Sequence, residues 1–129
     1  MTELRFRFRR LRGSERLRAL VRETSLVPSQ LILPVFVEEG ATRAVPIPSM
    51  PGVVRHTEAG LGEVVARARD LGIGAVMLFG VSQHKDACGS DTWNPEGLIA
   101  RMIRGARRAA PDMLVISDNC FCEYTDHGH

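Results

Sequence analysis

Three short apolar runs alternate with two amphipathic segments, and this alternation limits the possible folds more than any other feature of the chain. The runs are rich in β-forming residues and cover 31–37, 75–79 and 114–117. Between them, apolar residues recur at helical spacing over about 57–71 and 94–110. Buried strands that alternate with such helices predict a parallel sheet covered by helices. An open doubly wound sheet and a (β/α)8 barrel both fit this order.

Local signals set the expected boundaries of these elements. We expect Thr57 to cap the first helix, and Asn94 with Pro95 to begin the second. The segment 38–52 is rich in proline and glycine and predicts a loop with fixed turns. No Gly-x-Gly-x-x-Gly motif follows the first strand, which disfavours a dinucleotide-binding sheet. A complete barrel needs about 250 residues, so 129 residues would hold about three of its eight strands.

The chain is expected to have two parts, a basic arm with a short helix over 1–29 and the sheet over 30–129. Residues 1–22 hold eight arginines and two acids, although the whole chain carries a net charge of only +2. Ser14 is the expected N-cap of the short helix. Such an arm suits an acidic protein surface or nucleic acid. Because no aromatic ladder or zinc-finger spacing accompanies the arginines, we expect no nucleic-acid partner.

The cellular setting follows from what the sequence lacks. It has no apolar run near the ~20 residues that cross a membrane, and no stretch of signal-peptide type at its start. We therefore expect a cytoplasmic protein that does not bind membranes. The chain has three cysteines, an odd number, which argues against a disulfide framework in that compartment.

The segment richest in potential catalytic and metal-binding side chains follows the third strand and runs from Asp118 to His129. In α/β folds, functional groups gather beyond the carboxyl ends of strands. In an extended backbone, Cys120 and Cys122 would point the same way and could present two sulfurs to one metal. Thiolates suit zinc, which usually takes three protein ligands in a catalytic site. From the residues alone, His127 or His129 could complete the set, or the thiols could be buried and inert.

A family resemblance rests on this segment and on motifs along the whole chain. The run Asp118-x-Cys-Phe-Cys-Glu-Tyr-Thr-x-His-Gly-His129 resembles the metal motif of zinc-type porphobilinogen synthases, also called 5-aminolevulinate dehydratases. Further similar motifs are Arg9-Arg10-Leu11-Arg12, Leu33-Pro34-Val35-Phe36-Val37, Met50-Pro51-Gly52-Val53, Gly89-Ser90-Asp91 and Asn94-Pro95-Glu96. The sequence departs from the family pattern at Asn119 and Asp126. The resemblance implies that the chain forms the first three strands and two helices of a (β/α)8 TIM barrel, preceded by the arm.

The resemblance also implies a reaction and a division of roles. Members join two 5-aminolevulinate molecules into porphobilinogen, with loss of water, in heme and other tetrapyrrole biosynthesis. Zinc would be held by Cys120, Cys122 and a third cysteine expected just after His129, so the histidines would not be ligands. Asp118 matches a catalytic carboxylate. Two lysines of later strands form Schiff bases with substrate, and Lys85, the only lysine here, matches neither.

The same resemblance implies an assembly and leaves two alternatives open. In the family the arm wraps a neighbouring subunit and supports an octamer, and some members bind a regulatory magnesium. We expect the 129-residue chain, truncated before the Schiff-base lysines, to be inactive alone. It could instead be a non-catalytic short product that docks on full-length subunits. A small zinc-binding module is the other alternative.

Overall fold

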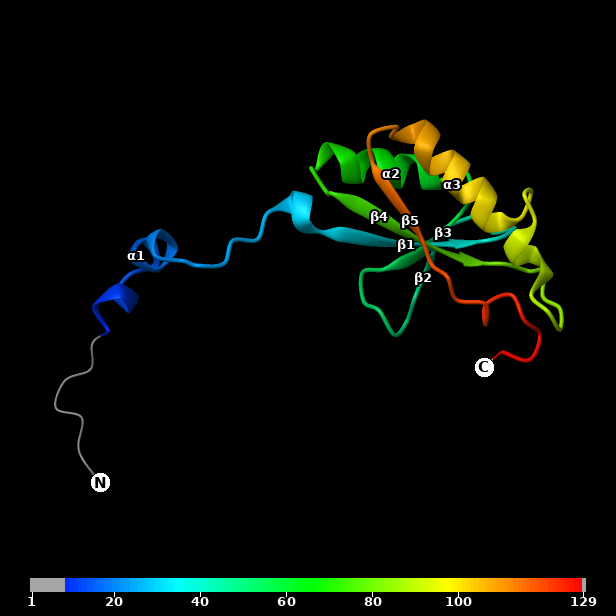
Figure 1. The fold of residues 1–129 in the computed structure, drawn as a ribbon, viewed down its shortest axis with the longest axis horizontal. Helices are drawn as coiled ribbons and strands as arrows, with labels where there is room; N and C mark the ends of the chain where they lie inside the picture. Colours follow the sequence, from blue (N-terminus) through cyan, green and yellow to red (C-terminus); the bar gives the residue numbers. More distant parts are fainter. Residues whose placement is uncertain (1–8, 129) are drawn as a thin grey trace, which may run out of the picture.

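One five-stranded sheet, in the order β2-β3-β1-β4-β5, forms the centre of the described chain (Figure 1). The structure is a computed structural model and describes residues 9–128. Its strands are β1 (Ile32–Glu38), β2 (Val45–Pro46), β3 (Val54–His56), β4 (Ala75–Val81) and β5 (Leu114–Ser117). Its α-helices are α1 (Glu15–Leu20), α2 (Leu61–Asp70) and α3 (Leu98–Ala109). Its 3-10 turns are η1 (Arg10–Arg12), η2 (Pro28–Gln30) and η3 (Ser90–Trp93).

The three predicted strands are β1, β4 and β5, and they pair in parallel as expected. Val35 of β1 pairs with Leu78 of β4, which in turn pairs with Ser117 of β5. Parallel neighbours need crossover connections, and α2 and α3 provide them. Both helices lie on the same face of the sheet (Figure 1). The predicted alternation of strand and helix is therefore confirmed.

The two short strands were not predicted. β2 lies inside the segment 38–52, which we expected to be only a loop, so that prediction is wrong there. β3 pairs in parallel with β1 through Phe36 and Arg55, and β2 pairs with β3 in antiparallel fashion. Strands of two or three residues are too short to show an alternating pattern. Their formation depends on β1 as a partner, which local sequence does not reveal.

Pro34 lies within β1 without disrupting the sheet. Proline has no N–H to donate to a neighbouring strand, so it is normally confined to strand edges. β3 pairs only with Phe36 and Val37, while the β4 side is paired along the whole of β1. Within the described residues, the β3 side of Pro34 is thus an edge that needs no donor.

Both main helices begin later than the sequence predicted. The hydroxyl of Thr57 accepts a hydrogen bond from Gly60 N at 2.9 Å, closing a turn before α2, and Gly60 is the N-cap. Asn94 likewise forms a separate turn, because Gly97 N donates to its carbonyl at 2.9 Å. Gly97 then caps α3. The predicted helix starts at Thr57 and Asn94 are therefore wrong, and the N-caps lie three residues further along the chain.

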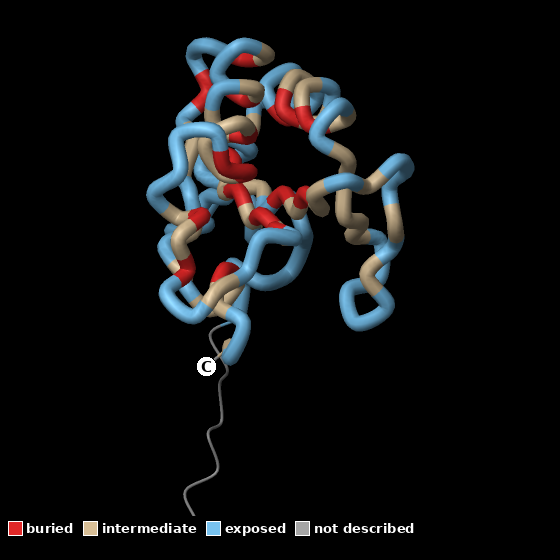
Figure 2. The backbone as a smooth tube through the Cα atoms, turned by 90° about the vertical axis from the view of Figure 1, so that its right-hand side faces the viewer, coloured by how far each residue is buried: buried red, intermediate tan, exposed pale blue. Residues whose placement is uncertain are grey.

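The core lies between the sheet and the two helices (Figure 2). Alternate residues of β1 and β4 point into it and are almost fully buried. They meet Leu61 and Val65 of α2 and Leu98 and Met102 of α3. Burying one such side chain contributes about 1.5–3 kcal/mol. The strand residues in this layer are Val35, Val37, Val76 and Leu78.

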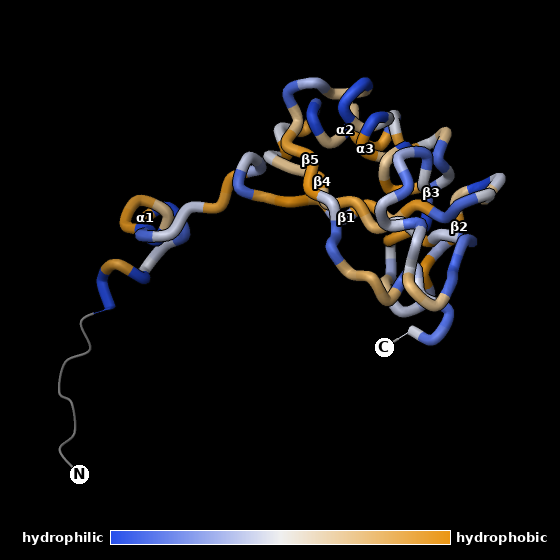
Figure 3. Tube along the Cα trace, turned by 45° about the vertical axis from the view of Figure 1, so that its right-hand side comes forward, coloured by the Kyte–Doolittle hydropathy of each residue, from blue (hydrophilic) through white to orange (hydrophobic). Residues whose placement is uncertain are grey.

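The opposite face of the sheet, called here the open face, carries no helix among residues 9–128. Apolar residues run along β1, β4 and β5 in Figure 3. Phe36 and Phe79 stack on the open face with ring centroids 5.0 Å apart. The Arg55 guanidinium lies 3.1 Å from the Glu38 carboxylate at its margin. This face is apolar in its middle and charged at the edge where β1 and β3 end.

The arm extends away from the sheet (Figure 1). Ser14 caps α1 as predicted, because its hydroxyl accepts from Leu17 N at 3.2 Å. Two leucines of the arm are largely exposed, Leu20 at 82% and Leu26 at 74%. Arg5 and Arg7, part of the predicted basic arm, lie outside the described residues. None of the described helices has the length and apolar character needed to traverse a bilayer.

Candidate metal centre

Asp118 is held where β5 ends. Its backbone N–H donates to Leu78 O at 3.1 Å, which continues the pairing of β5 with β4 by one residue. By strand alternation, position 118 then falls on the same side as Ile116. The carboxylate accepts from Asn119 N at 2.9 Å, so it also closes the turn that follows the strand. Asp118 is partly buried.

Cys122 lies in a turn over 121–124, closed by the bond from Tyr124 N to Phe121 O at 3.0 Å, rather than in the extended backbone that we expected. Cys120 precedes this turn and belongs to no strand. The neighbouring Cys120 thiol, together with burial and the charge of Glu123, raises the pKa of Cys122. That both thiols bind one metal stays a prediction.

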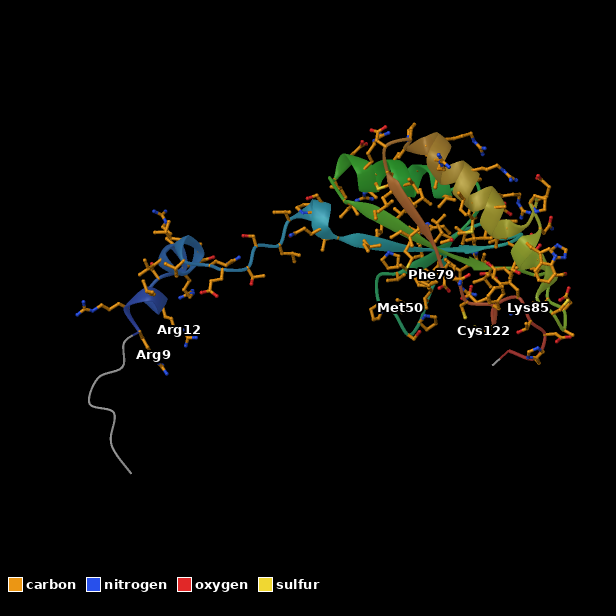
Figure 4. All side chains as sticks on the ribbon, viewed as in Figure 1. Arg9, Arg12, Met50, Phe79, Lys85 and Cys122 are labelled. Atoms are coloured by element: carbon orange, nitrogen blue, oxygen red, sulfur yellow. The ribbon has the colours of Figure 1, made fainter. Side chains whose placement is uncertain are left out.

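Acidic groups surround the thiol pair. Burial and the charge of Asp118 raise the pKa of Glu123, and Lys85 opposes this effect. Burial and the charge of Glu123 raise the pKa of Tyr124 to about 12, which keeps the phenol protonated near neutral pH. Figure 4 places Cys122 and Lys85 at the same end of the sheet. Two thiols in an acidic setting are a donor set that attracts a soft divalent cation.

The described residues do not complete a set of three metal ligands. No group of three His, Cys, Asp or Glu side chains within residues 9–128 is placed to hold an ion. Both ring nitrogens of His127 face carbonyl oxygens, Nε2 lying 3.3 Å from Ala87 O and Nδ1 3.0 Å from Gly128 O. The alternative in which His127 completes the set is therefore not assembled, and His129 lies outside the described residues. Cys120 and Cys122 fit zinc as two of its ligands.

A pocket of about 360 Å³ opens beside Asp118 and Cys120. It lies between η3, α3 and the residues that follow β5. Ile99 and Ile103 of α3 give it an apolar wall, and Asp118 and Cys120 give it a polar one. Trp93 borders the pocket, and its side chain is 66% exposed.

Two features of the site were not found from the sequence. The first is the contact between the loop after β4 and the cysteine segment: Asp86 N donates to Tyr124 O at 3.2 Å, and Asp126 N donates to Asp86 O at 3.1 Å. These residues are about 40 positions apart, and no local pattern joins them. The only local signal was an aspartate followed by small residues and Gly89, which is typical of a tight turn.

The second feature is an ion-pair network at the carboxyl ends of β1 and β4. Arg101 of α3 contacts Glu39 at 2.8 Å and Glu58 at 2.8 Å, and these bonds raise the pKa of Arg101. Glu39 also accepts from Gln83 N at 2.9 Å and lies 3.2 Å from the Ser82 hydroxyl. Burial alone would raise the pKa of Glu39, but the hydrogen bonds from Arg101, Gln83 and Ser82 outweigh it and lower the pKa. The network ties the loops around the site to α3.

A mainly parallel sheet with helices on one face and polar side chains beyond the strand ends is the arrangement expected for part of a (β/α)8 barrel. The family model described as "Delta-aminolevulinic acid dehydratase" matches residues 5–129. The chain belongs to the delta-aminolevulinic acid dehydratase family, which confirms the resemblance seen in the sequence. The predicted fold, the first part of a TIM barrel, is confirmed as well.

Individual relatives agree with this assignment. The chain is 49% identical over 129 residues to the delta-aminolevulinic acid dehydratase of Escherichia coli, covering all of this chain and 40% of that protein. It is 47% identical to the enzyme of Helicobacter pylori, covering 95% of this chain and 38% of that protein. A crystal structure from Toxoplasma gondii, solved with the reaction product porphobilinogen, superposes with a TM-score of 0.87 at 37% identity. The whole of this chain matches 37% of that structure's chain. The chain therefore spans about two fifths of its relatives' length.

Proposed function

We propose that this chain is part of a porphobilinogen synthase, which condenses two 5-aminolevulinate molecules into porphobilinogen with loss of water. The family match over residues 5–129 carries this proposal. The Toxoplasma gondii relative, described as porphobilinogen synthase with its product bound, supports the choice of product. The observed site adds chemistry that suits the reaction, since thiols, a carboxylate and a pocket lie together at the ends of β4 and β5.

Zinc is the metal that the donors favour. Cys120 and Cys122 would supply two thiolate ligands, and the third would come from a cysteine after His129. When bound, zinc acts as a Lewis acid that polarises a substrate oxygen or a water. The position of both cysteines in one short segment after β5, next to Asp118 and Glu123, supports this assignment. Other members use magnesium as a regulatory ion, and no residue of this chain is assigned to it.

Asp118 would be the carboxylate that accepts or relays protons beside the reacting groups. It is fixed by its backbone bond to Leu78 O and stands close to the thiol segment. The Schiff-base lysines would come from other strands of the barrel. Lys85 is exposed and lies near Glu123, a position that suits an ion-pairing role rather than a nucleophilic one. Residues 1–129 alone should therefore show no turnover.

The arm would bind a second copy of the protein. Its described part is basic at Arg9, Arg10 and Arg12, and it exposes Leu20 and Leu26. Buried at a subunit interface, these apolar side chains would leave water. A homo-oligomer, an octamer by family analogy, is thus the expected assembly, and the cytoplasm is the expected compartment.

A colorimetric assay tests the activity. The protein in its full natural length should convert 5-aminolevulinate to porphobilinogen, lose this activity after chelation, and regain it with zinc. The variants Cys120→Ser and Cys122→Ser should lose bound zinc and activity together. Cys88→Ser is the matched control: Cys88 is exposed in the loop after β4, and serine keeps its backbone N–H and a side-chain donor for Asp86, so zinc and activity should both remain. Failure of the metal-loaded wild type to form porphobilinogen would overturn the proposed function.

A further inference from the structure

Residues 86–90, called here the Asp86 loop, are folded around one carboxylate. Oδ1 of Asp86 accepts from Cys88 N and from Ser90 N, each at 3.0 Å. Oδ2 accepts from the Ser90 hydroxyl, and the Cys88 thiol lies 3.4 Å from Oδ1. The hydrogen bonds from Ser90 are the main reason that the pKa of Asp86 lies well below its usual value. The carboxylate is therefore ionised and serves as the centre of the turn.

The Asp86 loop is in turn paired with the cysteine segment. Asp86 forms a parallel bridge with Thr125, made by the two backbone bonds to Tyr124 O and from Asp126 N. The ring of His127 adds a contact to Ala87 O. These contacts fix the chain immediately after Cys122.

Gly89 shows how closely the two segments approach. Its backbone has φ +65°, which favours glycine. A Cβ built on it would lie 3.4 Å from Thr125 Cγ2, 3.6 Å from Tyr124 Cβ and 3.8 Å from Phe121 O. The Asp86 loop thus packs directly on the turn that contains Cys122. A change in its shape must shift that turn, because closely packed segments move together.

We propose that Asp86 is a positioning residue for the thiols of Cys120 and Cys122. It supplies no ligand. Its carboxylate fixes the Asp86 loop, and the loop fixes the backbone on which the thiols meet. The inference rests on the proposed metal centre, and it assigns to Asp86 the support that metal ligands commonly receive from groups around them.

Zinc affinity is the test, measured by competition with a chromophoric chelator on the protein in its full natural length. Asp86→Ala should weaken zinc binding by about 10-fold or more, the range typical of lost supporting contacts. It should also alter the thiolate-to-metal absorption of the cobalt-substituted protein. Asp86→Asn should fall between Asp86→Ala and wild type, since its amide oxygen can still accept from the two backbone N–H groups.

The matched control is Asp126→Asn. Asp126 is exposed and lies in the same segment, so this variant removes one negative charge from that segment but keeps the backbone N–H that bonds to Asp86 O. It should bind zinc as wild type does. An equal loss in Asp126→Asn and Asp86→Ala would overturn the proposal, because general electrostatics would then explain both.

Circular dichroism would reveal whether Asp86→Ala misfolds. A second variant keeps the proposal testable in that case. Gly89→Ala leaves the carboxylate untouched but strains the Asp86 loop, and it should also weaken zinc binding. Unchanged affinity and cobalt spectrum in folded Asp86 and Gly89 variants would refute the positioning role while leaving the metal centre standing. Retention of zinc by Cys120→Ser and Cys122→Ser would instead remove the metal centre itself.

Discussion

Gly74 lies where neighbouring backbone leaves no room for a Cβ atom. A Cβ at this position would lie 2.1 Å from Ser29 O, where η2 packs against the start of β4. We predict that Gly74→Ala destabilises the protein by about 1–3 kcal/mol, as overpacking generally does. Denaturant unfolding measures the change.

A matched glycine gives the contrast. Gly62 lies in α2, and its Cβ would meet Ala109 Cβ at an ordinary 3.7 Å. Gly62→Ala should be neutral or stabilising by up to about 1 kcal/mol, because alanine favours helices. Equal effects of the two substitutions would mean that η2 moves away from β4 at no cost.

Glu39 makes stability depend on pH. Its pKa is below the usual 4.5, so its ionised form stabilises the folded state. That contribution is complete above pH 4.5 and is lost as pH falls through the folded pKa. Glu39→Gln should therefore melt below wild type near neutral pH, and the gap should narrow toward pH 3. Thermal unfolding across this range tests it, with exposed Glu63→Gln as the control that keeps the wild-type profile.

At the residue scale, the sequence proposed candidate site residues but did not indicate the contacts that position them. Cys120, Cys122 and Asp118 were identified from their residue types and from the family motif. Their arrangement depends on Asp86, some 35 positions earlier, whose backbone pairs with the thiol segment. Such a contact arises only when the strands are placed side by side, so no local pattern contains it.

At the scale of elements, Arg101 connects α3 with the segments that follow β1 and precede α2. It links α3 to Glu39 after β1 and to Glu58 before α2. Its side chain is 34% exposed and that of Glu39 only 13%, whereas Arg104 and Glu96 pair at 44% and 78% exposure. Exposed pairs contribute little, and hydrogen bonds to less exposed carboxylates contribute more.

We therefore predict that Arg101→Lys, which loses the forked geometry, costs about 1 kcal/mol, while Arg104→Lys costs less than about 0.5 kcal/mol. Urea unfolding of both variants measures their free energies of unfolding and tests this difference. A larger loss for Arg104→Lys would mean that exposure is not what separates the two pairs.

Elements differed in how well the sequence predicted them, and length explains the difference. β1, β4 and β5 carry four to seven residues of apolar sequence, and each is recognisable alone. β2 and β3 have two and three residues and exist because β1 offers a neighbour. The helices were found by their apolar stripes, but their first turns were misplaced. Thr57 and Asn94 close turns that precede the helices. The residue type alone does not distinguish such a turn from the first turn of a helix.

At the scale of the whole molecule, two apolar surfaces lack cover within residues 9–128. The open face carries the stacked Phe36 and Phe79, and the arm exposes Leu20 and Leu26. This chain matches 40% of the length of its Escherichia coli relative, and closure of a barrel over the open face would depend on the rest. The arm is different, since its charge and its distance from the sheet suit a partner molecule (Figure 1).

The arm therefore predicts the last measurement, the mass of the assembly. Replacing Arg9, Arg10 and Arg12 by glutamine in the full natural length should shift the protein to smaller oligomers in light scattering after size exclusion. The basic arm would otherwise pair with the mildly acidic remainder of a second copy. The control replaces Arg107 and Arg108, two exposed arginines of α3, by glutamine. It also removes positive charge, but not from the arm, and it should leave the mass of the assembly unchanged. An unchanged mass in the arm variant would show that its arginines do not hold the subunits together, and exposed Leu20 and Leu26 would then be the next contacts to remove.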